Sequence, residues 1–418
     1  MPSIKSILPL LALALSTYGH AGVFDLSATM NGQTENATFT TAEEGIDIFE
    51  KNKLTSIFNT YNGTQIVKST LNFRGLPMNI AFPVDAGSLL TFDIPELGIK
   101  QSFQGATRDE SQELFKKYLK NNADFLNKVA EHLVKVSPVD PIAGNPNSMM
   151  SRAVQSDAQM MWYGSNHVFG NQLQNSNNNN STENSSNNKF GIGINYAHML
   201  SEATGNAKEM SSDAFTLPLS YSHQFAEPNH ELIINMPLAY IDTEGAKTYD
   251  GSLSIFYRRP IWDNWVLSFT ASGRGTGSTD LAGGSLMASG AIASSYVWSG
   301  ENWGLTLGNM IGYYSALRLK IDNTSINPNI ANTVFRNGLL YSLDSAWQLA
   351  GDPLSWEIYL VDTRFTGTDL FSNYQDEVGV TFGTRRPAHS KESDFRGGFS
   401  FTKGENVESY KFNFGTWF

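Results

Sequence analysis

The feature that most constrains this chain is a two-residue alternation of apolar with polar or small residues, which begins near Lys189 and continues to the C-terminus. In the first run, Phe190, Ile192, Ile194 and Tyr196 alternate with Gly191, Gly193, Asn195 and Ala197. Successive side chains of a strand point to opposite faces, so each run predicts a strand with one apolar face. We predict about 12 strands over 189–418, each near the roughly 9–11 residues that cross a bilayer on a tilt.

The residues at the strand ends and on the second face favour a membrane barrel over a soluble sandwich. We expect tryptophans near strand ends to lie at the membrane interface; they are Trp262, Trp265, Trp298, Trp303, Trp356 and Trp417. We expect the charges on the other face to compensate one another in a wet lumen, because each would cost a few kcal/mol in lipid; they are Arg258, Arg274, Arg336, Glu357, Arg385, Arg396 and Lys411.

The connections between the expected strands fall into two classes. Short links are predicted at 226–229, 260–264 and 299–302, and longer polar links at 200–213, 275–285 and 319–330. Outer-membrane barrels alternate short periplasmic turns with longer external loops. A barrel that starts in the periplasm and has an even number of strands also returns its C-terminus there.

The first 21 residues have the pattern of a cleaved signal peptide. Lys5 precedes an apolar run from Ile7 to Leu15, and Gly19-His20-Ala21 offers a cleavage site before Gly22. No long uncharged apolar stretch follows, so membrane insertion would have to use strands.

Residues 22–148 are expected to form an α+β region. Short alternating runs up to about Gly105 predict strands, and helical spacing predicts one or two amphipathic helices over 109–136, with Ser111 as a candidate cap. Prolines then make 139–147 an extended connector. Residues 149–188 are interpreted as a candidate luminal helix, with a strand as the alternative for 149–163, followed by a solvated Asn-rich linker.

Composition excludes several kinds of site. Cysteine is absent, which removes disulfides and thiolate metal sites. A net charge of -11 without a basic tract argues against nucleic-acid binding. No cofactor or metal motif is found, and Gly273 to Gly277, which lacks the Lys of a phosphate loop, is interpreted as a flexible barrel loop.

Two weak catalytic hypotheses are outweighed by structural roles, so no catalytic residue is predicted. Ser222 and His223 suggest a lipid hydrolase, but the strand period places them on opposite faces. His198 and Asp213 flank one predicted external loop, as a barrel protease would require.

The last strand resembles the C-terminal assembly signal of bacterial outer-membrane proteins. Tyr410, Phe412, Phe414 and the terminal Phe418 share one face, although Thr416 departs from the usual apolar residue. With the preceding candidate helix, residues 149–418 also resemble an autotransporter translocator. That resemblance implies a helix in the pore, a surface-displayed N-terminal region, and partners in outer-membrane lipid and the assembly machinery. It also implies candidate residues for release of a passenger, which we instead assign to a turn and to charge balance; they are Asn145, Asn147, Asp157 and Glu357.

These features support a non-enzymatic, solitary autotransporter-type barrel. The alternative is a porin-like channel for polar solutes with an N-terminal plug, and the third hypothesis is an outer-membrane lipid hydrolase.

Overall fold

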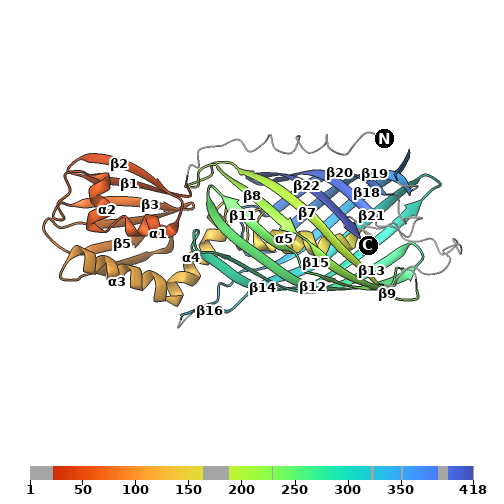
Figure 1. The fold of residues 1–418 in the computed structure, drawn as a ribbon. Coiled ribbons are helices and arrows are strands. Elements are labelled where there is room, and N and C mark those ends of the chain that lie inside the picture. The colour runs from red at the N-terminus through yellow and green to blue at the C-terminus, as the bar shows by residue number, and fades with distance from the viewer. Residues whose placement is uncertain are drawn as a thin grey trace.

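The computed structural model describes residues 22–162, 188–227, 229–321, 324–349, 352–384 and 394–417. The predicted signal peptide, most of the Asn-rich linker, Arg385 and Phe418 lie outside these ranges. Figure 1 shows an N-terminal α+β unit that sits at one end of a β-barrel. The fold class expected from the alternation is therefore confirmed.

The N-terminal unit is built on an antiparallel sheet with the strand order β2-β1-β3-β4-β5-β6. The tight turn between β1 and β2 uses Asn31 and Gly32, both with positive φ, as a two-residue hairpin turn requires. The strands are β1 (Phe24–Met30), β2 (Gln33–Phe39), β3 (Val67–Phe73), β4 (Leu76–Phe82), β5 (Leu90–Ile94) and β6 (Ile99–Phe103).

The helices of this unit are α1 (Ala42–Asp47), α2 (Lys51–Ile57), the 3-10 turn η2 (Pro95–Leu97), α3 (Arg108–Asn121) and α4 (Ala123–Val136). Of the one or two helices expected over 109–136, the structure has two. Asn122 leaves the helical conformation and its side chain accepts a hydrogen bond from Phe125 N at 2.9 Å, which caps α4. Thr107, and not Ser111, caps α3.

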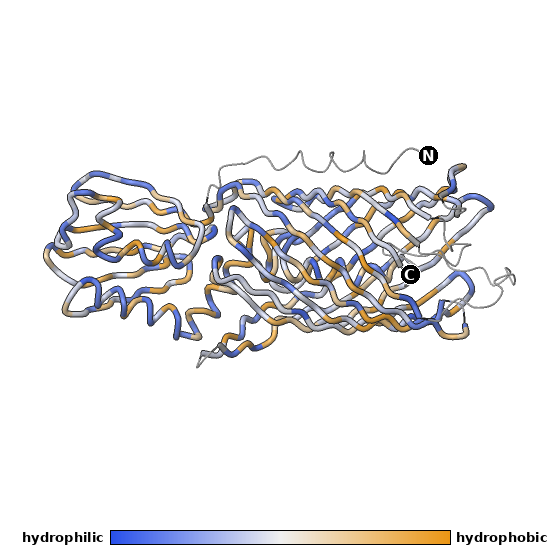
Figure 2. Tube along the Cα trace, viewed as in Figure 1, coloured by the Kyte–Doolittle hydropathy of each residue, from blue (hydrophilic) through white to orange (hydrophobic). Residues whose placement is uncertain are grey.

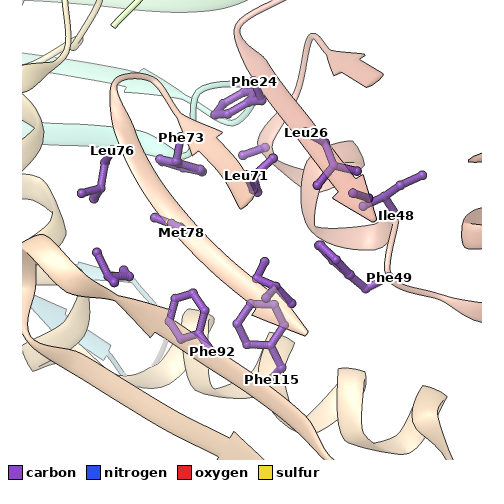
Figure 3. Close-up of a cluster of buried hydrophobic side chains, with 14 of the residues drawn as sticks. Phe24, Leu26, Ile48, Phe49, Leu71, Phe73, Leu76, Met78, Phe92 and Phe115 are labelled. Carbon is purple, nitrogen blue, oxygen red and sulfur yellow. The ribbon is translucent and has the colours of Figure 1, made fainter. Parts of the chain in front are cut away.

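The core of the unit lies between the sheet and the helices, as Figure 3 shows for Leu71, Met78 and Phe115. Phe92 of β5 packs against Phe115 of α3 and Phe125 of α4, with ring centroids 4.9 and 6.0 Å apart. The helices therefore supply aromatic side chains that cover one face of the sheet.

The barrel is a closed antiparallel wall of 12 strands, as predicted, within the described residues. It closes where the last strand pairs with the first, β22 with β7. The wall contains β7 (Asn188–Ser201), β8 (Met210–Leu217), β9 (Leu219–Gln224), β10 (Glu231–Asn235), β11 (Leu238–Thr243), β12 (Ala246–Trp262), β13 (Trp265–Ser278), β14 (Gly283–Ser299), β15 (Trp303–Leu317), β18 (Ala331–Leu349), β19 (Asp352–Gly367), β20 (Tyr374–Thr384), β21 (Asp394–Gly404) and β22 (Val407–Trp417).

Two strands of the wall are interrupted by proline. Pro218 separates β8 from β9, and Pro237, with Met236, separates β10 from β11. Proline has no N–H to donate to a β-ladder, so each strand is divided into two segments. The segments pair with the same neighbours, and the wall stays continuous.

The two ends of the barrel differ in their connections. The predicted short links lie at the end away from the N-terminal unit, and the predicted longer links lie at the end next to it. The link expected over 275–285 is shorter than predicted, because β13 continues to Ser278 and β14 begins at Gly283. Gly273 to Gly277 is therefore strand and not loop. The longest link carries a small hairpin of β16 (Leu319–Ile321) and β17 (Thr324–Ile326).

Among the described residues, no helix is both long and apolar enough to cross a bilayer.

Candidate functional site

A helix occupies the interior of the barrel. α5 (Met149–Asp157) and the following 3-10 turn η3 (Ala158–Met161) lie within the wall in Figure 1. The ambiguous segment 149–163 is thus helical through Met161. Because the chain enters the barrel interior before it forms the wall, the lumen is the candidate site.

A buried turn leads the chain into the lumen. Asn145 Nδ2 donates to Asp140 O at 2.8 Å, and Asn145 Oδ1 accepts from Asn147 N at 3.0 Å. Asn147 Nδ2 in turn donates to Ser212 O on β8 at 3.1 Å. The two asparagines therefore fix the start of α5 to the wall.

One side of α5 packs on an apolar part of the inner wall. Met150, Ala153 and Val154 are buried. The inner wall contributes residues of β14, β15, β18 and β19 to the same cluster, namely Met287, Ala291, Met310, Val334 and Phe365. The lumen is therefore not uniformly polar, since one sector matches an apolar helix face.

The other side of α5 is held by hydrogen bonds to four strands. Arg152 Nε lies 3.1 Å from Asp250 of β12. Gln155 accepts from Lys411 of β22 at 2.9 Å. The serines of the helix accept from the remaining two strands, Ser151 from Gln375 at 2.9 Å and Ser156 from Asn235 at 3.2 Å.

The charges predicted for the lumen, apart from Arg385, which lies outside the described residues, form ion pairs inside the barrel. Arg274 reaches Asp250 at 2.6 Å, in the cluster that Arg152 joins. Glu377 lies 2.9 Å from Arg336 and 3.7 Å from Lys411. Two further pairs are Arg396 with Glu357 at 3.5 Å and Arg258 with Glu231 at 3.6 Å. Asp250 and Glu377 were not predicted from the sequence, although the alternation places both on the same luminal face as the predicted charges.

Asp157 ends α5 and is fully buried. Its Oδ2 atom accepts from Tyr314 Oη at 3.0 Å and from Ser289 Oγ at 3.3 Å. The four residues considered for passenger release thus have separate partners: Asn145 and Asn147 at the start of α5, Asp157 at its end, and Glu357 on β19 beside Arg396. The structure does not bring them together as one site.

A cavity of about 150 Å³ remains between the polar side of α5 and the wall. Its lining includes Arg152, Gln155, Glu377, Lys411 and the two interrupting prolines, Pro218 and Pro237. A water molecule takes up about 30 Å³ of the liquid, so the cavity has room for a few waters beside the helix. Within the described residues, no group of three metal-ligating side chains is present.

The outer face of the wall is apolar. Figure 2 shows hydrophobic and hydrophilic positions alternating along the strands, and many large apolar side chains are exposed. On the closing strand, Phe412 and Phe414 are exposed by 55 and 53%, and Tyr410 is half-buried. A soluble protein does not leave so large an apolar belt in water, whereas a bilayer covers it.

Tryptophans gather at the end of the barrel away from the N-terminal unit. Trp262, Trp298, Trp303 and Trp356 are 42 to 64% exposed, Trp265 is half-buried, and the side chain of Trp417 lies outside the described part. At the opposite end the outer face instead carries ion pairs, Arg364 with Asp376 at 3.2 Å and Lys403 with Glu408 at 2.8 Å.

The structure also places the remaining catalytic candidates. Ser222 is buried inside the barrel and donates to Glu231 at 3.0 Å, whereas His223 lies on the outer face and contacts Asn188 at 2.9 Å. His198 and Asp213 do meet, at 2.8 Å, on the outer face near the N-terminal unit. They pair because their strands are neighbours, a relation that depends on barrel register.

Comparison with known proteins gives only remote structural likenesses. No family model and no curated protein matches the chain. The β domain of the Bordetella autotransporter BrkA is 12% identical, covers 55% of this chain and 98% of its own, and has a TM-score of 0.41. The translocator domain of NalP from Neisseria meningitidis is 11% identical, covers 64 and 97%, and has a TM-score of 0.39. An outer-membrane channel from Pseudomonas putida F1 is 11% identical, covers 57 and 97%, and has a TM-score of 0.38.

Autotransporter translocator barrels are thus among the structures that this chain resembles, and so is a channel. Likenesses this remote carry no argument about function, which has to come from the chain's own residues.

Proposed function

We propose that this chain is an autotransporter-like outer-membrane barrel that displays its N-terminal unit and tethers it through the lumen. One observation carries the proposal. The N-terminal unit covers one end of the barrel, α5 runs inside the wall, and β7 starts at the other end. The described chain thus enters the lumen at the end covered by the unit, and the first strand starts at the opposite end, as expected for a displayed segment tethered through the barrel.

The two barrel ends supply the orientation. Short turns, like those at the end away from the unit, are typical of the periplasmic side. The longest connection, between β15 and β18, and the outward ion pairs lie at the end next to the unit. This arrangement favours a cell-surface position for the N-terminal unit.

Several contacts hold the unit on the barrel, which supports anchoring over release. Ala42 N donates to Asp280 O, and Phe371 N donates to Val134 O, both at 2.8 Å. Lys208 lies 2.7 Å from Asp25. Beside these, the buried pair of Arg74 with Asp140 at 3.1 Å fixes the connector to the unit.

Protease shaving of intact cells tests the proposal. An epitope tag is inserted after Gly32, in the turn between β1 and β2. A side chain at this position would have no neighbouring atom within 4 Å of its Cβ, so the turn has room for an insertion. A matched tag goes into the Asp263-Asn264 turn at the opposite end of the barrel. Surface display predicts loss of the first tag and survival of the second in cells with an intact outer membrane.

The porin-like alternative makes the opposite prediction. Survival of the Gly32 tag together with loss of the Asp263 tag would place the N-terminal unit in the periplasm as a plug. That result would contradict display. A heat-modifiability gel on the same fractions checks that both tagged chains are folded barrels.

A further inference from the structure

The N-terminal unit contains a cavity of about 360 Å³ between its sheet and helices α1, α3 and α4. Its floor and walls are aliphatic and aromatic; they include Leu71, Met78, Ile80, Phe115, Leu126 and Val129. Figure 3 shows three of these side chains, Leu71, Met78 and Phe115, in the core of the unit. The cavity is thus lined by the same residues that hold the unit together.

The size and lining of the cavity fit an apolar ligand. Small-molecule sites have volumes of about 300–1,000 Å³ and are mostly apolar with a few polar groups. A methylene group is about as large as the roughly 30 Å³ share of a water molecule, so a linear chain of about a dozen carbons matches this volume. Apolar cavities stay dry and accept apolar guests.

The charged residues that line the cavity are Glu43 and Asp47 of α1 and Lys116 and Lys120 of α3. Lys116 of α3 is already engaged, at 2.8 Å from Asp47 and 2.6 Å from Glu50. Lys120 lies one turn further along α3 and also lines the cavity. Its side chain makes no hydrogen bond or ion pair within the described part of the chain, and the residue is exposed. A free ammonium group is therefore available beside an apolar cavity.

We propose that the N-terminal unit binds a linear alkyl carboxylate, such as a medium-chain fatty acid. The alkyl chain lies between the sheet and the helices, and the carboxylate pairs with Lys120. Thr279 and Ala282 of the link between β13 and β14 complete the lining, so the bound chain would also touch the barrel. The proposal does not depend on which side of the membrane the unit faces.

Photolabelling of the full chain in lipid nanodiscs tests the alkyl site. The probe is dodecanoic acid with a diazirine at its far end, and labelled peptides are mapped by mass spectrometry. The proposal predicts labels within 71–80 and 115–129 that excess dodecanoate removes. Labels confined to the outward faces of the barrel strands would overturn it.

Two pairs of variants sharpen the test. Leu119→Trp places an indole at the cavity, where Leu119 is a lining residue, and should abolish the labels in the unit. Its control Leu114→Trp lies on the same helix but outside the cavity, and should leave them unchanged. If Leu119→Trp does not fold, as judged by circular dichroism, the label map of the unmodified chain decides.

The charge reversals Lys120→Glu and Lys117→Glu test the carboxylate contact. Lys117 lies outside this cavity. The concentration of dodecanoate that halves labelling should rise about tenfold for Lys120→Glu and stay constant for Lys117→Glu. Dodecanol should compete equally in both variants. Equal dodecanoate competition in the two variants would overturn the assigned role of Lys120.

Discussion

Replacing Glu377 with Gln should strongly destabilise the barrel. One carboxylate oxygen of Glu377 lies 2.9 Å from Arg336, and the other accepts from Ser400 at 2.8 Å and from Tyr359 at 3.3 Å. Lys411 lies 3.7 Å away. The amide keeps the shape of the side chain but removes its charge, which leaves two enclosed cations without their carboxylate.

The size of the expected loss of stability follows from the burial of these side chains. The side chains of Glu377 and Arg336 are each 8% exposed, and that of Lys411 is 15% exposed. Removing one partner of a buried ion pair costs about 3–5 kcal/mol. Because a cavity with room for a few waters adjoins the cluster, we expect the lower end, about 3 kcal/mol.

The assay is urea unfolding of the barrel in lipid vesicles, followed by tryptophan fluorescence. The matched control is Glu227→Gln, because Glu227 pairs with Arg259 at 3.5 Å on the exposed surface. Exposed pairs contribute about 0–1 kcal/mol, so the control should barely shift the midpoint. If the two variants lose the same stability, the luminal charges are hydrated and the reasoning is wrong.

Two further predictions concern the N-terminal unit. Phe115→Ala should destabilise the unit by about 3–5 kcal/mol, because Phe115 is 1% exposed. Leu114→Ala should cost little, because Leu114 is 44% exposed. Thermal unfolding followed by circular dichroism compares the two variants, and equal losses of stability would contradict the assignment of Phe115 to the core. Acid should also weaken the unit: burial alone would raise the pKa of Asp47, but hydrogen bonds from Lys116 and Lys53 outweigh it and hold the pKa below 3.8. The stability that ionised Asp47 contributes is fully present above its usual pKa and is lost as the pH falls through its lowered pKa in the folded state. Asp47→Asn should therefore make stability depend less on pH in acid, and an unchanged pH dependence would contradict the assignment.

The sequence was sufficient to predict the barrel because alternation is a local property of each strand. Tyr410, Phe412 and Phe414 share a face whatever lies beside them. The wall tolerates even its two prolines without losing the pattern. Boundaries were harder, since Gly273 to Gly277 continues β13 and Asn122 ends one helix and caps the next. Both outcomes depend on tertiary pairing and backbone conformation, which periodicity does not record.

The partners of the luminal charges could not be predicted, because they depend on register. Arg336 of β18 and Glu377 of β20 are 41 positions apart and meet across the intervening strand β19. The same holds for His198 and Asp213, which meet only once β7 pairs with β8. A pattern gives the face on which a residue lies, whereas the neighbour on that face follows from strand order and shear.

The composition of the lumen bears on whether α5 is a removable plug or a resident tether. If α5 left, the apolar sector that includes Met310, Val334 and Phe365 would be exposed to water. Asp250 would lose Arg152, and Lys411 would lose the Gln155 carbonyl. The apolar sector of the wall thus matches the apolar face of the helix, and the polar sector matches its polar face. A channel for polar solutes needs only the polar sector. The wall is therefore built to keep its helix, which favours anchoring over conduction.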